Sequence, residues 1–296
     1  MRFDSAVGPL IEVDDLDDHR LNGYRGLNDP ATRRRLESEL ATVVVEGRVA
    51  VRQLLRSRLA IRSLLVDDHQ VRLVADLVDA VRDRGATVYV VPRTRMAELV
   101  GFRMHRGVVA LAARPTAIDP VDLLADAADQ PGPPGGLRLL AVLEGLNDAE
   151  NIGALFRNAA AYGVAGILLD PTCADPLYRR SVRVSSGHSL HLPFARLDPW
   201  PDALDQVRAA GFVVCALAPH PPGRTPVVLH RLLAHLSDRT PATTGVALLV
   251  GAEGPGLSEA ALAAADEIVT IAMAPGVDSL NVATAVAVAF DRLSSP

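Results

Sequence analysis

The chain contains no lysine, since every one of its 30 basic residues is an arginine, a bias that indicates a GC-rich coding sequence more than a function. It also has only two cysteines, Cys173 and Cys215, which match neither a metal-ligand spacing nor a disulfide framework. This usage fits a reducing compartment. We therefore expect a cytoplasmic protein with no bound metal.

Long hydrophobic segments are missing as well. The longest apolar run lies inside Leu280–Phe290 and is too short to cross a bilayer, and the first ten residues lack a signal-peptide pattern. We therefore expect no membrane partner. The composition, with 49% hydrophobic residues, 22 Gly and 21 Pro, is that of a globular chain. A length of 296 residues is sufficient for two domains.

The order of apolar and polar segments predicts how these domains divide. Residues 1–38 combine an acidic run with turn signals and read as an N-terminal extension. Residues 39–115 alternate between helices and strands and predict a small α/β domain. Residues 116–136 read as a linker, because they contain one short helix and then Q-P-G-P-P-G-G. Residues 137–296 alternate again and predict a parallel sheet.

Finer boundaries follow from the same alternation. In the first domain we expect helices at 46–57, 70–84 and 94–100, and strands at 61–66, 87–91 and 107–112. The linker helix is expected at 121–128. In the second domain the strands are expected near five apolar positions, which are Leu139, Ile167, Phe212, Val246 and Ile268.

Two apolar runs near the C-terminus lead into loops rich in small and polar residues. The run 246–250 precedes G-A-E-G-P-G-L-S, which ends at Ser258, and the run 268–273 precedes A-P-G-V-D-S-L-N-V-A and a helical segment. Loops at the carboxyl ends of parallel strands bind ligands in open α/β sheets. The glycine loop has neither the Lys-Ser/Thr of a phosphate-binding loop nor the dinucleotide spacing, and a glycine-rich loop by itself is more often an ordinary tight turn than a binding site.

A third block, E-G-L-N-D-A-E-N-I-G-A-L-F-R, follows the strand expected at 139–143. A helix is predicted to start near Asn151, which is a good N-cap residue. Asn151 and Arg157 are six residues apart, nearly two helical turns, so both side chains can lie on one side of the helix. Taken alone, Arg157 has the ordinary interpretation of a solvated surface arginine.

Together these blocks resemble the SpoU/TrmH family of the SPOUT class, the knotted RNA ribose 2'-O-methyltransferases. The resemblance covers about the last 160 residues. It is carried by N-x-G-x-x-x-R from Asn151, G-x-E-G-x-G-L from Gly251 and S-L-N-V from Ser279, and more weakly by S-S-G-H-S-L-H-L-P from Ser185. One departure is Ala252, where many members carry Asn; we expect little effect there.

The resemblance implies S-adenosylmethionine as the cofactor, a homodimer, and a deep C-terminal trefoil knot in a parallel-sheet domain that follows a small α/β substrate-binding domain. It implies catalytic or positioning roles for Asn151, Arg157, Glu253, Ser279 and Asn281. It implies cofactor contacts for Leu217, Ala218, Gly251, Gly256, Ile271 and Leu280. A guanidinium stays protonated in water, so Arg157 either stabilises the developing alkoxide or passes the proton to an RNA phosphate, and the sequence leaves both open.

The charge distribution indicates which part faces RNA. The net charge is −5, but residues 1–115 carry 19 arginines against 16 acidic residues, whereas the remainder is acidic. The arginines and one histidine that cluster there are our predicted RNA contacts, with a solvated face, or for the histidine a cap or core-edge position, as the alternative: Arg33, Arg34, Arg35, Arg103, His105 and Arg106.

The nature of the substrate is predicted by analogy alone. The resemblance favours ribosomal over transfer RNA, because a separate N-terminal domain suits a structured target. A transfer-RNA enzyme, a non-catalytic methyltransferase-like RNA-binding protein and an unrelated nucleotide-binding α/β enzyme remain alternatives. The intact motif residues argue against the second, and the missing phosphate-loop fingerprints argue against the third.

Overall fold

The computed structural model describes residues 7–104, 107–130, 137–219, 223–239 and 245–294; the side chains of Arg33, Ser38 and 237–239 lie outside this set. The chain forms two compact units. The first contains residues up to Thr116 together with Leu177–His191, and the second contains Ala117–Pro176 together with the residues from Leu192 onward. None of the described helices is long and apolar enough to cross a membrane.

The first unit is built on a five-stranded mixed sheet in the order β1-β4-β3-β5-β2. Its strands are β1 (Leu10–Glu12), β2 (Thr42–Glu46), β3 (Ile61–Asp67), β4 (Thr87–Val91) and β5 (Val108–Ala113). Strands β1 and β3 run parallel to β4, while β5 is antiparallel to β2 and β3. The Val-rich sequences of β2 and β4 favour the pleated conformation.

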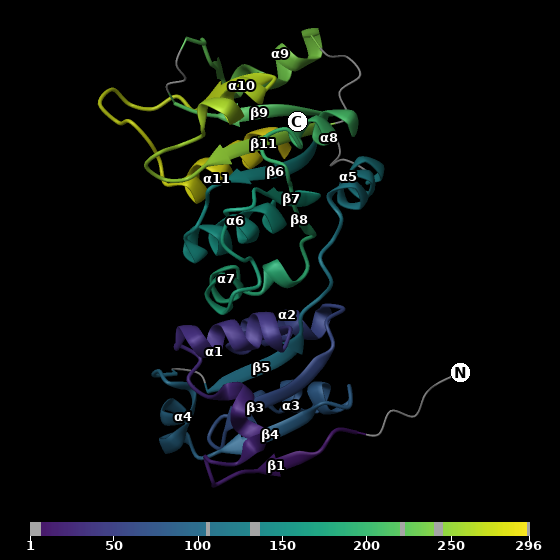
Figure 1. Ribbon diagram of the computed structural model, residues 1–296, viewed down its shortest axis with the longest axis vertical. Helices are drawn as coiled ribbons and strands as arrows, with labels where there is room; N and C mark the ends of the chain where they lie inside the picture. Colours follow the sequence, from purple (N-terminus) through teal and green to yellow (C-terminus); the bar gives the residue numbers. More distant parts are fainter. Residues whose placement is uncertain (1–6, 105–106, 131–136, 220–222, 240–244, 295–296) are drawn as a thin grey trace. The chain divides into compact units, whose positions relative to one another are not determined.

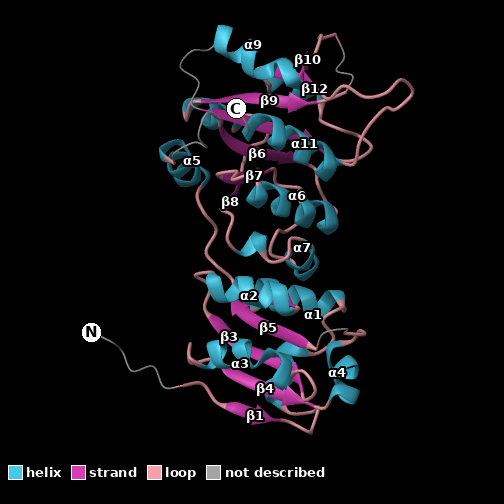
Figure 2. Ribbon diagram, turned by 180° about the vertical axis from the view of Figure 1, so that it is seen from behind, coloured by secondary structure: helices cyan, strands magenta, loops and turns pink. Residues whose placement is uncertain are grey.

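Helices cover this sheet. The helical elements of the first unit are η1 (His19–Tyr24), α1 (Pro30–Arg34), η2 (Arg35–Glu39), α2 (Arg48–Arg56), η3 (Val71–Val74), α3 (Ala75–Arg82), α4 (Arg93–Val100), α7 (Arg179–Val184) and η4 (His188–Leu190). Figure 2 shows α2 and α3 lying along the strands. The predicted elements at 61–66, 87–91 and 94–100 are confirmed as β3, β4 and α4. The strand β2 was not predicted.

The expected N-terminal extension is wrong, because the described residues before position 39 are integral to the first unit. Strand β1 pairs with β4 and forms the edge of the sheet. The side chains of Leu21 and Tyr24 are fully buried, and the Tyr24 hydroxyl lies 2.6 Å from the Ser63 hydroxyl. Mixed turn and helix signals concealed this apolar content.

Residues 177–191 pack with the first unit although we assigned them to the second domain. Arg179 forms an ion pair with Glu46 at 2.5 Å, and its guanidinium lies over the Phe102 ring. Gly187 has a φ of +86°, and a Cβ there would lie 3.0 Å from the Ala50 Cα atom. The Ser-x-Gly sequence thus provides a tight turn against α2. Glu46 and Ala50 lie more than 130 residues away in sequence and Phe102 lies 77 residues away, which is why local patterns did not indicate these contacts.

The second unit is a seven-stranded parallel sheet in the order β10-β12-β9-β11-β6-β7-β8 (Figure 1). Its strands are β6 (Arg138–Glu144), β7 (Gly166–Leu169), β8 (Phe194–Arg196), β9 (Phe212–Leu217), β10 (Val227–Val228), β11 (Gly245–Gly251) and β12 (Glu267–Thr270). The five predicted strands are confirmed, and the short edge strands β8 and β10 were missed. Strand β12 ends at Thr270, three residues before the predicted end.

Both faces of this sheet are covered by helices, which are α5 (Pro120–Asp129), α6 (Ala149–Ala161), α8 (Leu204–Ala209), η5 (Leu229–Arg231), α9 (Leu232–Arg239), α10 (Glu259–Ala264) and α11 (Val282–Ser294). Alternate residues of β6 enter two separate cores. Leu139 and Leu143 meet α6, α9 and α11, whereas Leu140 and Val142 meet α5, α8 and α10. This two-sided burial explains the nearly continuous apolar strands.

Helix α6 begins earlier than predicted. Its N-cap is Asp148, whose side chain accepts a hydrogen bond from the backbone N–H of Glu150. Asn151 therefore lies inside the first turn, and its side chain is available for other contacts. Asp148 satisfies the same requirement three residues earlier, because either side chain can cap a helix.

Candidate active site

A cavity of about 500 Å³ lies at the carboxyl ends of β9, β11 and β12 in the second unit. All six residues predicted to contact a cofactor line it, namely Leu217, Ala218, Gly251, Gly256, Ile271 and Leu280. Three of the predicted catalytic residues, Glu253, Ser279 and Asn281, line it as well. Strands β9 and β12 are neighbours, and so are β9 and β11, so their following loops meet at one edge.

The glycine loop after β11 owes its shape to close backbone contacts. The backbone N–H of Gly256 donates to the Ala252 carbonyl at 3.0 Å and closes the turn. A Cβ at Gly251 would lie 2.4 Å from the Gly256 carbonyl carbon, so only glycine fits there. Gly254 and Gly256 have positive φ angles of +91° and +71°, which glycine adopts at little cost. The loop thereby presents its backbone to the cavity.

A hydrogen-bonded chain of three polar side chains reaches one end of the cavity, where two of them, Glu253 and Asn281, line it. The Asn281 amide nitrogen Nδ2 donates to Glu253 Oε1 at 2.6 Å and to Asn151 Oδ1 at 3.0 Å. The Asn281 Oδ1 atom accepts from the backbone N–H groups of Ala283 and Thr284 and so caps α11. Asn281 thus joins all three sequence motifs, which are separated by up to 130 residues.

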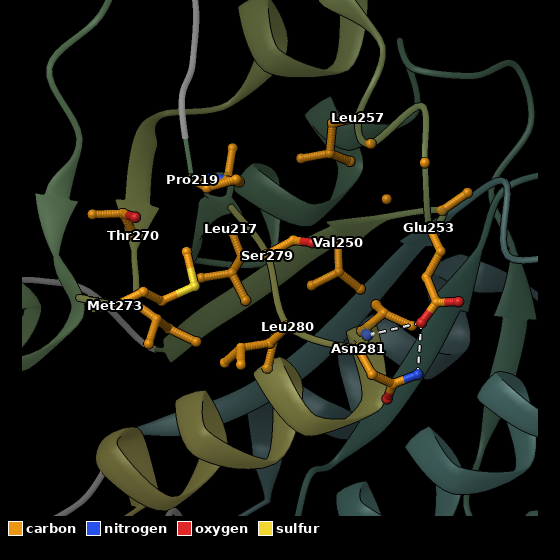
Figure 3. A pocket seen from close by; sticks show the side chains of 18 residues that line it. Leu217, Pro219, Val250, Glu253, Leu257, Thr270, Met273, Ser279, Leu280 and Asn281 are labelled. Atoms are coloured by element: carbon orange, nitrogen blue, oxygen red, sulfur yellow. Dashed lines mark hydrogen bonds between the residues drawn. The ribbon is translucent and has the colours of Figure 1, made fainter. Parts of the chain in front are cut away.

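The opposite side of the cavity is apolar. Leu217, Met273 and Leu280 lie together there, while Glu253 and Asn281 lie at the polar end (Figure 3). Such a cavity, apolar with a few fixed polar groups, is typical of a small-molecule site, and its volume falls in the usual range. The exposed glycine loop offers backbone hydrogen-bonding groups to such a ligand, and the apolar wall offers it hydrophobic surface. No cluster of His, Cys, Asp or Glu within the described part of the chain could hold a metal ion.

Arg157 does not line the cavity. It lies on the exposed side of α6, about 9 Å along the helix axis from Asn151, and has no hydrogen-bond or ion-pair partner among the described residues. Its side chain is therefore available to an external ligand. Asn151 does not line the cavity either, but it is joined to a lining residue by its hydrogen bond to Asn281, whereas Arg157 is not.

The predicted RNA contacts remain predictions. Arg34, Arg35 and Arg103 are exposed on the first unit, and Arg35 donates to the Asn22 carbonyl. Arg33 lies on α1 without a described side chain, and His105 and Arg106 lie outside the described residues.

Glu144, at the end of β6, is a residue of this site that sequence reasoning missed. Its side chain is buried, with 8% exposure, and accepts hydrogen bonds from Trp200 Nε1 at 2.7 Å and from the Ser258 hydroxyl and backbone N–H at 2.7 and 2.8 Å. Ser258 ends the glycine loop and caps α10. Glu144 thereby fixes one end of the loop. An acidic residue ending an apolar strand was the only available signal.

Comparison with known proteins points to the family that the three sequence motifs resemble. Residues 138–291 match the model of the SpoU rRNA Methylase family, and residues 44–117 match the model described as RNA 2'-O ribose methyltransferase substrate binding. An uncharacterized tRNA/rRNA methyltransferase of Mycobacterium tuberculosis is 42% identical over 279 residues, which are 94% of this chain and 90% of that protein.

Solved structures are similar along nearly the whole chain. The AdoMet-bound rRNA methyltransferase from Sinorhizobium meliloti has a TM-score of 0.74 at 25% identity and covers 96% of this chain and 97% of that one. The SpoU methyltransferase AviRb from Streptomyces viridochromogenes, in complex with the cofactor AdoMet, shares the fold, with a TM-score of 0.70 at 24% identity and coverage of 94% and 98%.

Proposed function

Because the chain belongs to the SpoU rRNA methylase family, we propose that it transfers a methyl group from S-adenosylmethionine to a ribose 2'-hydroxyl of RNA. The observation that carries this proposal is the cavity at the ends of β9, β11 and β12, with the Glu253–Asn281–Asn151 chain at its polar end. Ribosomal RNA is the proposed substrate and the cytoplasm the proposed location.

When bound, S-adenosylmethionine supplies an electrophilic methyl group on a positively charged sulfur. The glycine-loop backbone and the apolar wall of Leu217, Ile271 and Leu280 would hold it and keep water out. Asn281 is held rigidly, since it caps α11 and donates to Glu253, and it orients Asn151 through the 3.0 Å hydrogen bond. Holding two reacting groups in attack geometry can lower the barrier by roughly 7–11 kcal/mol.

The polar end then receives the ribose. The Asn151 side-chain oxygen accepts a hydrogen bond from Asn281, so the Asn151 Nδ2 donors remain available to the sugar, as does the Ser279 hydroxyl. The bound cofactor would supply the methyl carbon to the 2'-oxygen and leave as a neutral thioether, while the hydroxyl proton would pass to an RNA phosphate or to water. We propose that Arg157 acts as a fixed cation toward the forming alkoxide.

The position of Arg157 supports a homodimer. This residue lies outside the cavity wall of its own chain, and three large apolar side chains of the C-terminal region are exposed, namely Val277, Leu280 and Val288. We propose that a second copy covers this region. Co-expression of Arg157→Ala and Gly251→Ala chains distinguishes a dimer in which Arg157 serves the partner's cavity from one in which it serves the cavity of its own chain. About one quarter of wild-type activity is expected if Arg157 serves the partner's cavity, and none if it serves its own.

The trefoil knot belongs to the same proposal. Support comes from α11, which packs against α6 and β6 directly after the chain has left β12, a strand three positions away from β6 in the sheet. Tracing the backbone through an experimental density map tests it.

Methyl transfer tests the function directly. Labelled methyl from S-adenosylmethionine is offered to unmodified ribosomal RNA and, separately, to transfer RNA, with wild type and Arg157→Ala side by side. We expect label in ribosomal RNA, at a 2'-oxygen, and at least a hundredfold loss in the variant. Label only in transfer RNA overturns the substrate, and absence of cofactor binding by wild type overturns the proposal.

A further inference from the structure

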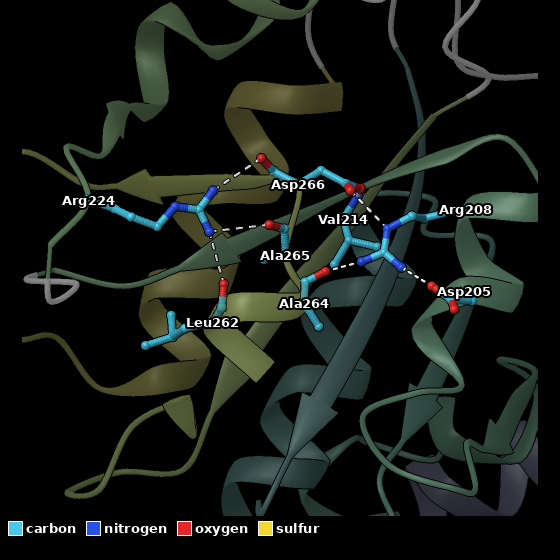
Figure 4. Close-up of polar contacts among 8 residues, drawn as sticks. All are labelled: Asp205, Arg208, Val214, Arg224, Leu262, Ala264, Ala265 and Asp266. Carbon is cyan, nitrogen blue, oxygen red and sulfur yellow. Dashed lines mark hydrogen bonds and ion pairs between the residues drawn. The ribbon is translucent and has the colours of Figure 1, made fainter. Parts of the chain in front are cut away.

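Two arginines hold the connector between α10 and β12 (Figure 4). Arg208, on α8, donates through Nε to Asp266 Oδ1 at 2.8 Å and through Nη2 to the Ala264 carbonyl. Arg224 lies in the segment between β9 and β10. It donates through Nη1 to the Leu262 carbonyl at 3.0 Å and through both nitrogens to two further carbonyls. The guanidinium fork suits several acceptors at once, and the last carbonyls of a helix lack intrahelical partners.

The connector does not depend on Arg224 for its position. The Asp266 backbone N–H donates to the Val214 carbonyl at 3.0 Å, and its Oδ2 atom accepts from the Val214 N–H at 2.8 Å. These bonds and Arg208 already fasten the connector to β9. What Arg224 adds is a fixed point for its own segment.

That segment joins two walls of the cavity. Pro219, five residues before Arg224, lines the cavity together with the two preceding residues at the end of β9. Val228, four residues after Arg224, pairs in register with Thr270, which lines the cavity from β12. Arg224 itself is exposed and outside the cavity. Without its guanidinium, the described residues just before β10 lose these three hydrogen bonds to the connector.

We propose that Arg224 is a positioning residue for cofactor binding: its hydrogen bonds to the carbonyls of the α10–β12 connector restrain the position of Pro219, whereas Leu217 and Ala218 on the same wall are already held by Val269 of β12. This inference rests on the proposed function, since it takes the cavity to be the S-adenosylmethionine site. Because Arg224 touches neither the cavity nor the Glu253–Asn281–Asn151 chain, its effect falls on binding and not on the transfer step.

The test compares Arg224→Ala with Arg231→Ala. Arg231 is also exposed and has no hydrogen-bond partner among the described residues, so it matches the change in charge without the clamp. S-adenosylmethionine dissociation constants are measured by calorimetry, KM and kcat by methyl transfer at saturating RNA, and thermal unfolding by Trp200 fluorescence. We expect Arg224→Ala to raise Kd and KM about tenfold with kcat within about twofold, and Arg231→Ala to change neither.

Arg224→Lys adds a second readout. A lysine keeps the charge but cannot span three carbonyls, so an intermediate Kd is expected. An unchanged Kd in Arg224→Ala, or a fall in kcat without a rise in KM, overturns the inference and leaves the proposed function standing. Equal loss of affinity in Arg231→Ala also overturns it, because charge alone then explains the effect. Failure of wild type to bind the cofactor overturns both.

Discussion

Replacing Ser258 tests how strongly Glu144 holds the glycine loop. Ser258→Ala removes the 2.7 Å hydroxyl bond to the buried carboxylate and the 3.1 Å bond from the Ala261 N–H to the same hydroxyl. A hydrogen bond to a charged group contributes about 1.5–3 kcal/mol, and an N-cap about 0.5–2 kcal/mol. Since the two share one hydroxyl, we expect the free energy of unfolding to fall by roughly 2–4 kcal/mol.

The only tryptophan makes the assay specific. Trp200 belongs to the second unit and donates to Glu144 Oε1, so its fluorescence in urea reports on this unit and on this cluster. A double-mutant cycle with Glu144→Gln isolates the pair, and we expect a coupling energy of about 1–3 kcal/mol. Ser258→Thr keeps the hydroxyl and serves as the control, with a loss within about 1 kcal/mol.

A coupling energy near zero, with Ser258→Ala losing no more free energy of unfolding than Ser258→Thr, would refute the reasoning that the Glu144 carboxylate fixes the glycine loop. If the reasoning holds, cofactor affinity falls in Ser258→Ala, because the loop that presents its backbone to the cavity loses its anchor.

Three further predictions concern other parts of the chain. Gly251→Ala should abolish cofactor binding in calorimetry, because its Cβ would lie 2.4 Å from a backbone carbon, whereas Gly254→Ala, with nothing within 4 Å, should cost only about 1–2 kcal/mol of backbone strain and still bind. Arg179→Ala breaks a nearly buried ion pair with Glu46, so faster hydrogen exchange across 177–191 is expected, and unchanged protection there contradicts it. Burial raises the pKa of the Cys173 thiol to about 12, while an unfolded thiol titrates near 8.5. The protonated thiol therefore makes its full contribution to the free energy of unfolding below about pH 8.5, and this contribution is lost as the pH rises toward 12. In Cys173→Ala the free energy of unfolding should depend less steeply on pH over this range.

The local sequence was sufficient to predict an element wherever the contacts that determine its conformation are also local. Continuous apolar runs such as Val246–Val250 predicted buried parallel strands, and the loops after two of them predicted a ligand site where the structure has a cavity. The glycines of the turn after β11 are required by its own backbone geometry, so their pattern was readable without the fold.

Contacts between residues that are distant in sequence could not be predicted from the sequence alone. Glu144 and Ser258 are 114 residues apart, and each alone is an ordinary polar residue at the end of an element. The assignment of 177–191 to the first unit depends on Arg179 reaching Glu46, and the burial of Tyr24 depends on a sheet made by later strands. Such contacts are selected by the burial of charges and apolar surface in the whole fold, which no window of sequence contains.

The site itself combines both kinds of information. Sequence alone determined which residues carry the three motifs and that each motif belongs to a block that follows a strand. Only the tertiary structure decided that Asn281 bonds both Glu253 and Asn151, while Arg157 is exposed and does not line the cavity. The physical reason is that a helix fixes the direction of each side chain relative to the sheet on which it packs, and that packing is set by the apolar face of α6 and not by its polar residues.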